Sequence, residues 1–303
     1  MEPTIIALRG FNRFYTRLVG ALDARFLDTD VTLPEARLLF EIATREPATA
    51  SALQAAMGMD AGYVSRIVAR FEERGWIRRD RDDADSRARP IRLTDAGRAI
   101  FATIDTRQRG AVADLVAPLD AVGRADLIEA VARVRLLLDP ASIDGFAIRT
   151  FRTGDIGRIA ARQSILYAES HGWGRGLEVV EGEVTTAFLR NFAPGREQCW
   201  VAEIDGVMAG SVFVTDEGDG TARLRLLYVE PFARGRGIGD ALVATCIGFV
   251  RDRGYARLTL WTQAVLETAR RIYARHGFEQ IDEAVHHGFG QPVAGETWRL
   301  SLT

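Results

Sequence analysis

Lysine is absent from this chain of 303 residues, so every one of its 39 basic side chains is an arginine. The phosphate-binding P-loop needs a lysine, and this absence excludes that class of nucleotide site. The 41 acidic residues bring the formal net charge to -2, so no general positive field attracts nucleic acid. Any DNA-binding surface must therefore be a local patch.

Cysteine is scarce, and long apolar runs are missing. Cys199 and Cys246 lie far apart and match no disulfide or metal spacing, which suits a reducing compartment. There is no run of 18 apolar residues, and the N-terminus lacks the charged-then-apolar order of a signal peptide. The adjacent His286 and His287 have no further ligand at a workable spacing, so we expect no metal. These absences predict a soluble cytoplasmic protein without a membrane partner.

The length predicts two domains. Turn-forming residues gather between Asp139 and Gly145, where the pattern changes from helical to mixed α/β. We therefore expect one domain over residues 1–140 and a second over residues 146–303.

Periodicity in the first domain predicts a mostly helical fold with one small hairpin. The expected helices cover residues 5–22, 34–42, 49–57, 61–74, 96–107 and 125–138, and the expected strands cover residues 76–79 and 91–93. The helix over 61–74 buries Val64, Ile67, Val68 and Phe71, which turns Ser65, Arg66 and Arg70 outward. Small and hydrogen-bonding residues on an outer face suit a reader of the DNA major groove, although a solvated helix face has the same pattern.

The segment from Asp85 to Gly97, DSRARPIRLTDAG, matches the pattern D-x-R-x-x-x-(I/V)-x-L-T-x-x-G. In this motif, and in the helix order around it, the chain resembles the MarR family of transcription regulators. The resemblance implies a winged helix-turn-helix that binds double-stranded DNA, with Ser65, Arg66 and Arg70 at the major groove. It also implies that Arg87 or Arg89 reaches the minor groove. The first and last helices would form a homodimer that reads a palindromic site.

Periodicity in the second domain predicts alternating strands and helices. The expected strands cover residues 146–151, 199–204, 207–214, 224–229, 257–261 and 296–302, and the expected helices cover residues 156–170, 183–192, 238–253 and 265–275. Asp205 and Gly206 mark a hairpin turn between the second and third of these strands. Cys246 falls on the apolar face of its helix, so we expect a core residue rather than a nucleophile.

A glycine-rich turn, RGRGIG over residues 234–239, joins the strand over 224–229 to the next helix. Such a turn leaves several backbone N–H groups pointing one way at a helix N-terminus, which forms an anion site. Its glycines do not fit the G-x-G-x-x-G dinucleotide fingerprint. The pattern R-x-x-G-x-G, together with RIYARHGF over residues 271–278, resembles the GNAT superfamily of acyl-CoA N-acyltransferases.

The GNAT resemblance implies an α/β (α+β) acyltransferase fold with a mixed, largely antiparallel sheet and acetyl-CoA as cosubstrate. The backbone of Arg234, Gly235, Arg236, Gly237, Ile238 and Gly239 would bind its diphosphate, with charge from Arg234 and Arg236. The strand end at Leu227, Tyr228 and Val229 would hold the reacting carbonyl. Tyr273 would protonate the departing thiolate, although a core tyrosine is the alternative.

Two positions depart from the superfamily pattern. Leu266 stands where many members have an asparagine, and Arg223 stands where some relatives have a glutamate. The general base therefore stays open between Glu230, Glu203 and a relayed water. The acceptor pocket is expected to draw on the first two helices of the domain and a late loop, through Tyr167, His171, Trp173, His286, His287 and Phe289.

The sequence as a whole predicts a transcription regulator that also acetylates a small primary amine. Because the chain has no lysine, its only primary amine is the N-terminal amino group, and any other acceptor must be a different molecule. One alternative is a regulator whose GNAT-like domain senses acyl-CoA without turnover. The other is an enzyme whose winged domain serves only to dimerise.

Overall fold

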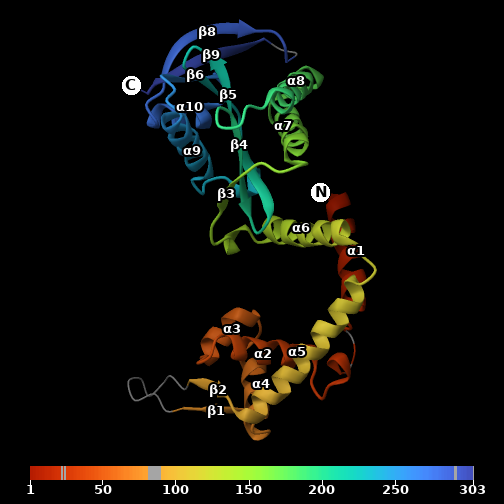
Figure 1. Ribbon diagram of the computed structural model, residues 1–303. Helices are drawn as coiled ribbons and strands as arrows, with labels where there is room; N and C mark the ends of the chain where they lie inside the picture. Colours follow the sequence, from red (N-terminus) through yellow and green to blue (C-terminus); the bar gives the residue numbers. More distant parts are fainter. Residues whose placement is uncertain (22, 24, 81–89, 290–291, 303) are drawn as a thin grey trace. The chain divides into compact units, whose positions relative to one another are not determined.

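A computed structural model describes residues 1–21, 23, 25–80, 90–289 and 292–302. The chain forms two compact units, Met1–Val122 and Gly123–Thr303. Their elements are labelled in Figure 1. Among the described residues no helix is both long enough and apolar enough to cross a membrane.

The first unit is a helical domain with a two-stranded antiparallel sheet. Its elements are α1 (Glu2–Leu18), the 3₁₀ turn η1 (Phe26–Asp28), α2 (Leu33–Thr44), α3 (Ala50–Met57), α4 (Ala61–Glu73), β1 (Ile77–Arg79), β2 (Ile91–Leu93) and α5 (Asp95–Val116). Gly58 ends α3 in the left-handed conformation, and Asp60 caps α4 by accepting a hydrogen bond from the Tyr63 N–H. The residues predicted to line the inner face of α4 are all buried. This arrangement is a helix-turn-helix followed by a wing.

Thr94 and Gly97 fix the junction between the wing and α5. The Thr94 hydroxyl donates to the Gly75 carbonyl oxygen and accepts from the Gly97 N–H, so it caps the helix and ties down the preceding turn. A Cβ atom on Gly97 would overlap the carbonyl oxygen of Trp76. The L-T-x-x-G part of the motif is therefore explained by packing, because α5 approaches the start of the wing so closely that only glycine fits at position 97.

The second unit packs helices on both faces of a seven-stranded sheet (Figure 1). Its strands are β3 (Ala147–Thr150), β4 (Gln198–Ile204), β5 (Val207–Gly218), β6 (Thr221–Val229), β7 (Arg257–Gln263), β8 (Glu279–His286) and β9 (Val293–Ser301). Its helices are α7 (Asp155–His171), α8 (Arg175–Asn191), α9 (Ile238–Asp252) and α10 (Glu267–Arg275), with the 3₁₀ turns η2 (Pro140–Ser142) and η3 (Pro231–Ala233). The strand order is β3-β4-β5-β6-β7-β9-β8, and of these described strands only β6 and β7 pair in parallel. The predicted mixed, largely antiparallel fold is confirmed.

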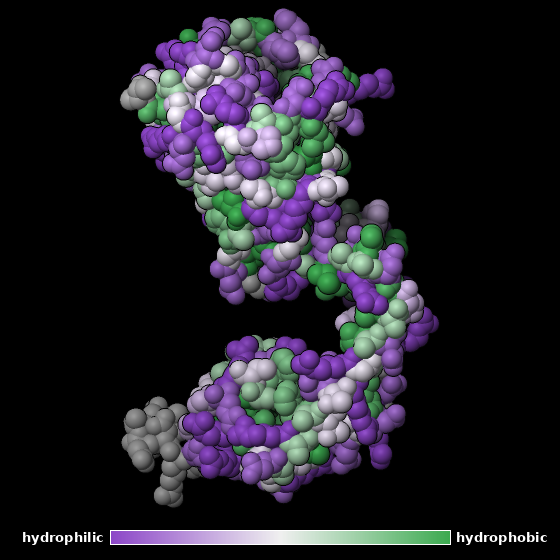
Figure 2. Space-filling view, in the orientation of Figure 1, coloured by the Kyte–Doolittle hydropathy of each residue, from purple (hydrophilic) through white to green (hydrophobic). Residues whose placement is uncertain are grey.

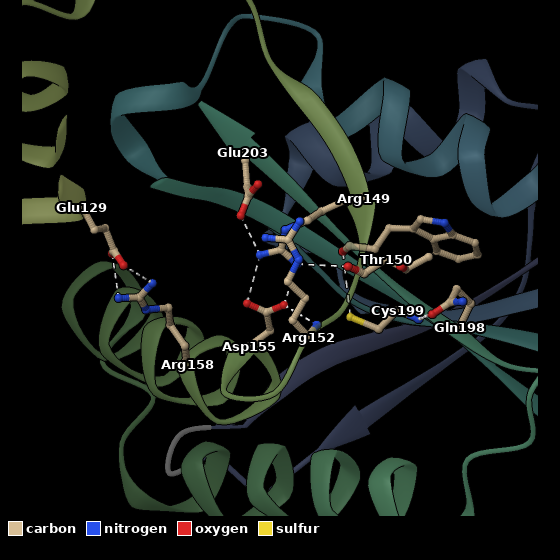
Figure 3. Close-up of polar contacts among 10 residues, drawn as sticks. Glu129, Arg149, Thr150, Arg152, Asp155, Arg158, Gln198, Cys199 and Glu203 are labelled. Carbon is tan, nitrogen blue, oxygen red and sulfur yellow. Dashed lines mark hydrogen bonds and ion pairs between the residues drawn. The ribbon is translucent and has the colours of Figure 1, made fainter. Parts of the chain in front are cut away.

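The units divide earlier in the chain than the linker expected at residues 139–145. Most of α6 (Ala121–Leu138) belongs to the second unit, where Leu136 is fully buried among the sheet's core residues. Ion pairs join Arg135 to Asp205 and Glu129 to Arg158, the second with 2.6 Å between nitrogen and oxygen (Figure 3). Sequence periodicity predicted a helix over residues 125–138 but did not reveal that Leu136 packs on the sheet.

Two other differences shape the second unit. Strand β8 was not predicted, because nearly every one of its side chains is exposed and the strand has no apolar alternation. Helix α8 begins eight residues before the predicted start at Glu183, over a stretch interrupted by Gly176 and Gly182. Glycine is a poor helix former, which hid this part of the helix.

We expect Gly97→Ala to destabilise the first unit by about 1–3 kcal/mol, the usual cost of an added core methyl group. Gly110→Ala is the matched control, because it lies in the same helix with no atom within 4 Å of an added Cβ. It should be neutral or stabilising by up to about 1 kcal/mol. Urea unfolding of both variants measures the difference, and equal stabilities would contradict the packing role of Gly97.

Candidate functional site

The parallel strands β6 and β7 separate part-way along their length. They pair from Thr221 with Arg257 to Leu224 with Leu260, and the pairing ends there. Leu226 has a positive φ of 48°, and the register of β6 against β5 shifts at the same place. This bulge bends the end of β6 away from β7. Beyond Leu224 the edge of β6 that faces β7 therefore has backbone groups without a strand partner.

The end of β6 leads through η3 into the glycine-rich turn and α9. Gly235 and Gly237 have positive φ values of 76° and 78°, and added Cβ atoms there would meet open space. In the described part of the chain, no acceptor receives the backbone N–H groups of residues 235–240. They lie at the start of a helix of 15 residues, whose dipole adds partial positive charge. The turn predicted to bind an anion therefore presents a run of free donors.

The two arginines of this turn have different surroundings. The Arg234 side chain is exposed, and its Nε donates to the Val229 carbonyl oxygen at 3.3 Å. The Arg236 guanidinium instead donates to the carbonyl oxygens of Pro140 and Ile143. We therefore revise the expectation that Arg236 supplies charge to a bound anion, since its side chain holds the segment before β3. Its backbone N–H remains part of the turn.

Two adjoining cavities of about 430 Å³ each open on this region. The first cavity is lined mainly by α8, β6, β7 and β8, and includes Arg223, Arg225 and Tyr273. The second is lined by β6, α10 and the end of α7, and includes Tyr228, Val229, Arg234 and Gly239. Both are lined by Gln163, Tyr167, Leu227, Leu266 and Ala269. The second cavity thus lies beside the glycine-rich turn, and the first cavity adjoins it where β6 and β7 separate.

Tyr273 lies in the first cavity with 4% of its surface exposed. Its hydroxyl makes no hydrogen bond to any other described residue. Burial raises the pKa of Tyr273 well above its ordinary value, and Tyr167 raises it further. Burial also raises the pKa of Tyr167 to about 12. Both phenols are therefore protonated at neutral pH and able to donate a proton.

Glu181 is a buried carboxyl group in the same cavity, and sequence reasoning missed it. It is 2% exposed, and the Ser164 hydroxyl donates to its Oε2 at 2.5 Å. Burial raises the pKa of Glu181 to about 7, with a smaller increase from Glu178 and a decrease from the Ser164 hydrogen bond. Gln163, also 2% exposed, has a buried Oε1 with no donor among the described residues.

Aromatic side chains form the wall of the first cavity. Trp173 and Phe289 lie 5.6 Å apart between ring centroids, and Phe289 lies 4.7 Å from His286. The start of α8 packs closely on the loop before Phe289, since a Cβ on Gly176 would overlap the Gly288 carbonyl oxygen. Of the residues expected at an acceptor pocket, Tyr167, Trp173, His286 and Phe289 line this cavity, and His171 lines the second. His287 is exposed and lines neither.

Glu230 and Glu203 are not free bases. Glu230 is 2% exposed and accepts two hydrogen bonds from Arg162, at 2.7 and 2.9 Å. Glu203 accepts from Arg149 at 2.6 Å, and the same guanidinium binds Asp155 (Figure 3). Neither carboxylate lines either cavity. Both were open choices for the base, and the structure assigns both to ion pairs that position strands and helices.

In the first unit, the outer face of α4 carries the residues expected at DNA. Ser65 and Arg66 are exposed, and the Arg66 guanidinium lies 5.8 Å from the Tyr63 ring centroid. Arg70 forms an ion pair with the buried Glu35 of α2, so part of its charge is already neutralised. Arg87 and Arg89, expected at the minor groove, lie outside the described residues.

Two known protein families match the chain, one in each of its two units. Residues 165–278 match the acetyltransferase (GNAT) family, and residues 29–88 match the MarR family. The chain joins a MarR-type helix-turn-helix to a GNAT domain. The GNAT match includes β6, the glycine-rich turn, Glu181 and Tyr273, and the MarR match includes all of α4.

Curated acetyltransferases and a synthetase match part of the chain. N-acetyltransferase 8 from Rattus norvegicus is 35% identical over 107 residues, which is 34% of this chain and 47% of the relative. Mycothiol acetyltransferase from Beutenbergia cavernae is 33% identical over 88 residues, or 29% of each chain. N-acetylaspartate synthetase from Danio rerio is 35% identical over 85 residues, 28% of this chain and 30% of the relative. The chain thus spans less than half the length of these relatives.

Solved structures also resemble this domain. YncA from Salmonella typhimurium, solved with its cofactor acetyl-CoA, has 20% identity and a TM-score of 0.44, covering 53% of this chain and 95% of its own. Ribosomal-protein-alanine N-acetyltransferase from Brucella melitensis has 21% identity and a TM-score of 0.43, covering 52% and 99%.

Proposed function

We propose that this chain is a cytoplasmic transcription regulator whose GNAT domain transfers an acetyl group from acetyl-CoA to a small primary amine. The observation that carries the proposal is the run of free N–H groups over residues 235–240, beside two adjoining cavities. Free donors at a helix N-terminus suit a diphosphate, and the open space at Gly235 and Gly237 lets an anion approach the backbone. Relatives named as N-acetyltransferases support an amine as the acceptor.

In this proposal each residue has a defined task. The backbone of residues 234–239 holds the diphosphate, and Arg234 adds positive charge. Bound acetyl-CoA supplies a thioester carbonyl as the electrophile. The end of β6 over Leu227, Tyr228 and Val229 is proposed to stabilise the charge that develops on the carbonyl oxygen, with the backbone N–H groups of Leu227 and Val229 on the edge that faces away from β5. Tyr273, which burial keeps protonated, donates its proton to the departing sulfur.

The MarR-type unit is proposed to bind double-stranded DNA through the outer face of α4. Ser65 and Arg66 are exposed and can reach base edges or phosphates. Arg70 is also a proposed DNA contact, but its ion pair with Glu35 reduces the positive charge that it presents to DNA. Arg87 and Arg89 stay proposed contacts of the minor groove. With a net charge of -2, affinity depends on this local surface and should fall with salt.

We further propose that the protein is a homodimer that reads a palindromic site. Large apolar side chains are exposed on α1, α5 and α6, and green surface on α1 and α5 is visible in Figure 2. They include Ile6, Phe11, Phe14, Val112, Leu115, Val131 and Leu138. So much exposed apolar surface favours association, and two-fold symmetry would match two DNA half-sites.

We expect Gly237→Glu to abolish acetyl-CoA binding, because a carboxylate at the turn repels the diphosphate and fills the open space. Gly154→Glu is the matched control, since Gly154 is also an N-cap with positive φ and open surroundings but lies outside both cavities. Calorimetric titration with acetyl-CoA compares the two variants with the wild type. No saturable binding to the wild type would refute the cosubstrate assignment.

We expect Tyr273→Phe to slow acetyl transfer by roughly 100-fold or more while acetyl-CoA binding stays unchanged, as for loss of a general acid. Tyr255→Phe is the control, because Tyr255 is equally buried but its hydroxyl donates to the Arg196 carbonyl oxygen away from both cavities. Mass spectrometry of amine mixtures detects the product. If the wild type binds acetyl-CoA, forms no product and changes its DNA affinity, the domain is a sensor.

We expect Arg66→Ala to weaken DNA binding and, if Arg66 contacts a phosphate, to lower the salt-dependence slope by about one unit. Arg109→Ala is the control, since Arg109 is 80% exposed on α5. The probe is a duplex selected from a random library by the wild-type protein, and binding is measured by fluorescence anisotropy. If the wild-type protein enriches no DNA sequence, the DNA-binding proposal fails, and the alternative in which the winged unit serves only to dimerise is favoured.

A further inference from the structure

Glu181 differs from the other buried carboxylates around it. Asp155, Glu230 and Glu296 each pair with an arginine, at 2.6, 2.7 and 2.9 Å. Glu197 has no arginine partner, but its two carboxylate oxygens accept hydrogen bonds from two backbone N–H groups, at 3.1 Å each. Glu181 is as deeply buried, yet among the described residues its side chain receives only the Ser164 hydroxyl. A buried carboxylate is costly unless a cation compensates it. Because Glu181 faces a cavity rather than the core, a bound ligand can supply that cation.

A second buried polar residue, Gln163, lines the same cavity. The buried Oε1 of Gln163 receives no hydrogen bond from any described residue. Gln163 belongs to α7, as does Ser164, whereas Glu181 belongs to α8. A carboxylate without a cation and an amide oxygen without a donor, on adjacent helices, call for a ligand with several donors and a positive charge. A primary ammonium group, with three N–H donors, meets both requirements.

The rest of the first cavity is suited to an apolar body. Trp173, Leu177 and Phe289 form a buried cluster, with Val180 and Trp261 also on the lining. A volume of about 430 Å³ lies within the range of small-molecule sites. Aromatic walls favour a flat, apolar ligand over a strongly polar one.

We propose that Glu181, together with Gln163, binds the ammonium group of the acetyl acceptor and takes its proton, and that the acceptor is a primary amine with an aromatic body. This inference rests on the proposed acetyl transfer. In the proton step an N–H bond breaks and a carboxyl O–H bond forms, while the electron pair stays on nitrogen. The neutral amine is then nucleophilic, and Tyr273 remains available for the departing sulfur.

The surroundings of Glu181 suit this role. With its pKa at about 7, the carboxyl group is ionised above neutral pH and can accept a proton from an ammonium group. The amine remains cationic through this range, since a lysine-like amine titrates near 10. Affinity for the cation should therefore rise as the pH rises through 7. The other titratable or charged groups on this cavity or beside Glu181 are Tyr167, Glu178, Arg223, Arg225, Tyr273 and His286.

The test is calorimetric titration without acetyl-CoA, using phenethylamine and its uncharged analogue 2-phenylethanol. The wild type should bind phenethylamine at least about 10-fold more tightly than the alcohol. Glu181→Gln should weaken phenethylamine binding by roughly 10- to 100-fold, the worth of a hydrogen bond to a charged group, and leave the alcohol unchanged. Glu178→Gln, an exposed position on the same helix, should change neither by more than about threefold.

A second measurement needs no variant of Glu181. Wild-type affinity for phenethylamine should rise about 10-fold from pH 6 to pH 8, following the ionised fraction of a group with a pKa near 7. We expect the His286→Asn variant to show the same rise in affinity with pH, which would assign the pH dependence to the Glu181 carboxylate rather than to the histidine. Equal binding of amine and alcohol, or a flat profile, overturns the proposal. Because acetyl-CoA is absent, failure here is separate from failure to bind the cosubstrate.

Discussion

The second unit depends on one interruption of hydrogen bonding, where β6 and β7 stop pairing after Leu224 and Leu260. A continuous sheet would close this edge and leave no chamber for a ligand. The bulge at Leu226 prevents that closure, because its positive φ turns the end of β6 out of register. The same strand end leads directly into the glycine-rich turn, so the unpaired edge, the free donors and both cavities share one origin.

The buried carboxylates of the second unit differ in whether an arginine compensates their charge. Arg162 holds Glu230, which follows β6, and Arg149 ties α7 and β4 to β3 through Asp155 and Glu203. These ion pairs fix the walls of the opening, and removing one partner would leave a buried charge uncompensated. Glu181 has no such cation, and its pKa is raised accordingly. Among the buried carboxylates of the described residues in the second unit, Glu181 thus combines the lack of a cation with a place on a cavity.

Sequence reasoning succeeded where a local pattern has a local cause. The glycine-rich turn, the inner face of α4 and the L-T-x-x-G junction each depend on residues a few positions apart. It failed where the cause was distant. The exposed strand β8 has no periodicity, the glycines in α8 hid the turns that carry Glu181, and Leu136 is buried only because α6 packs on the sheet. The roles expected of Glu230 and Arg236 changed because their partners are remote in sequence.

These distant contacts also connect the end of β6 to α6 within the second unit. Glu129 of α6 pairs with Arg158 on the same helix as Arg162, which holds Glu230 at the end of β6. A ligand that engages the strand end thus acts on a segment joined, through α7, to the ion pair on α6. Coupling requires that the ligand bind two arrangements of this segment with different affinity. The buried Leu136 limits such motion, whereas the ion pairs Glu129–Arg158 and Arg135–Asp205 lie nearer the surface and are the more adaptable contacts in α6.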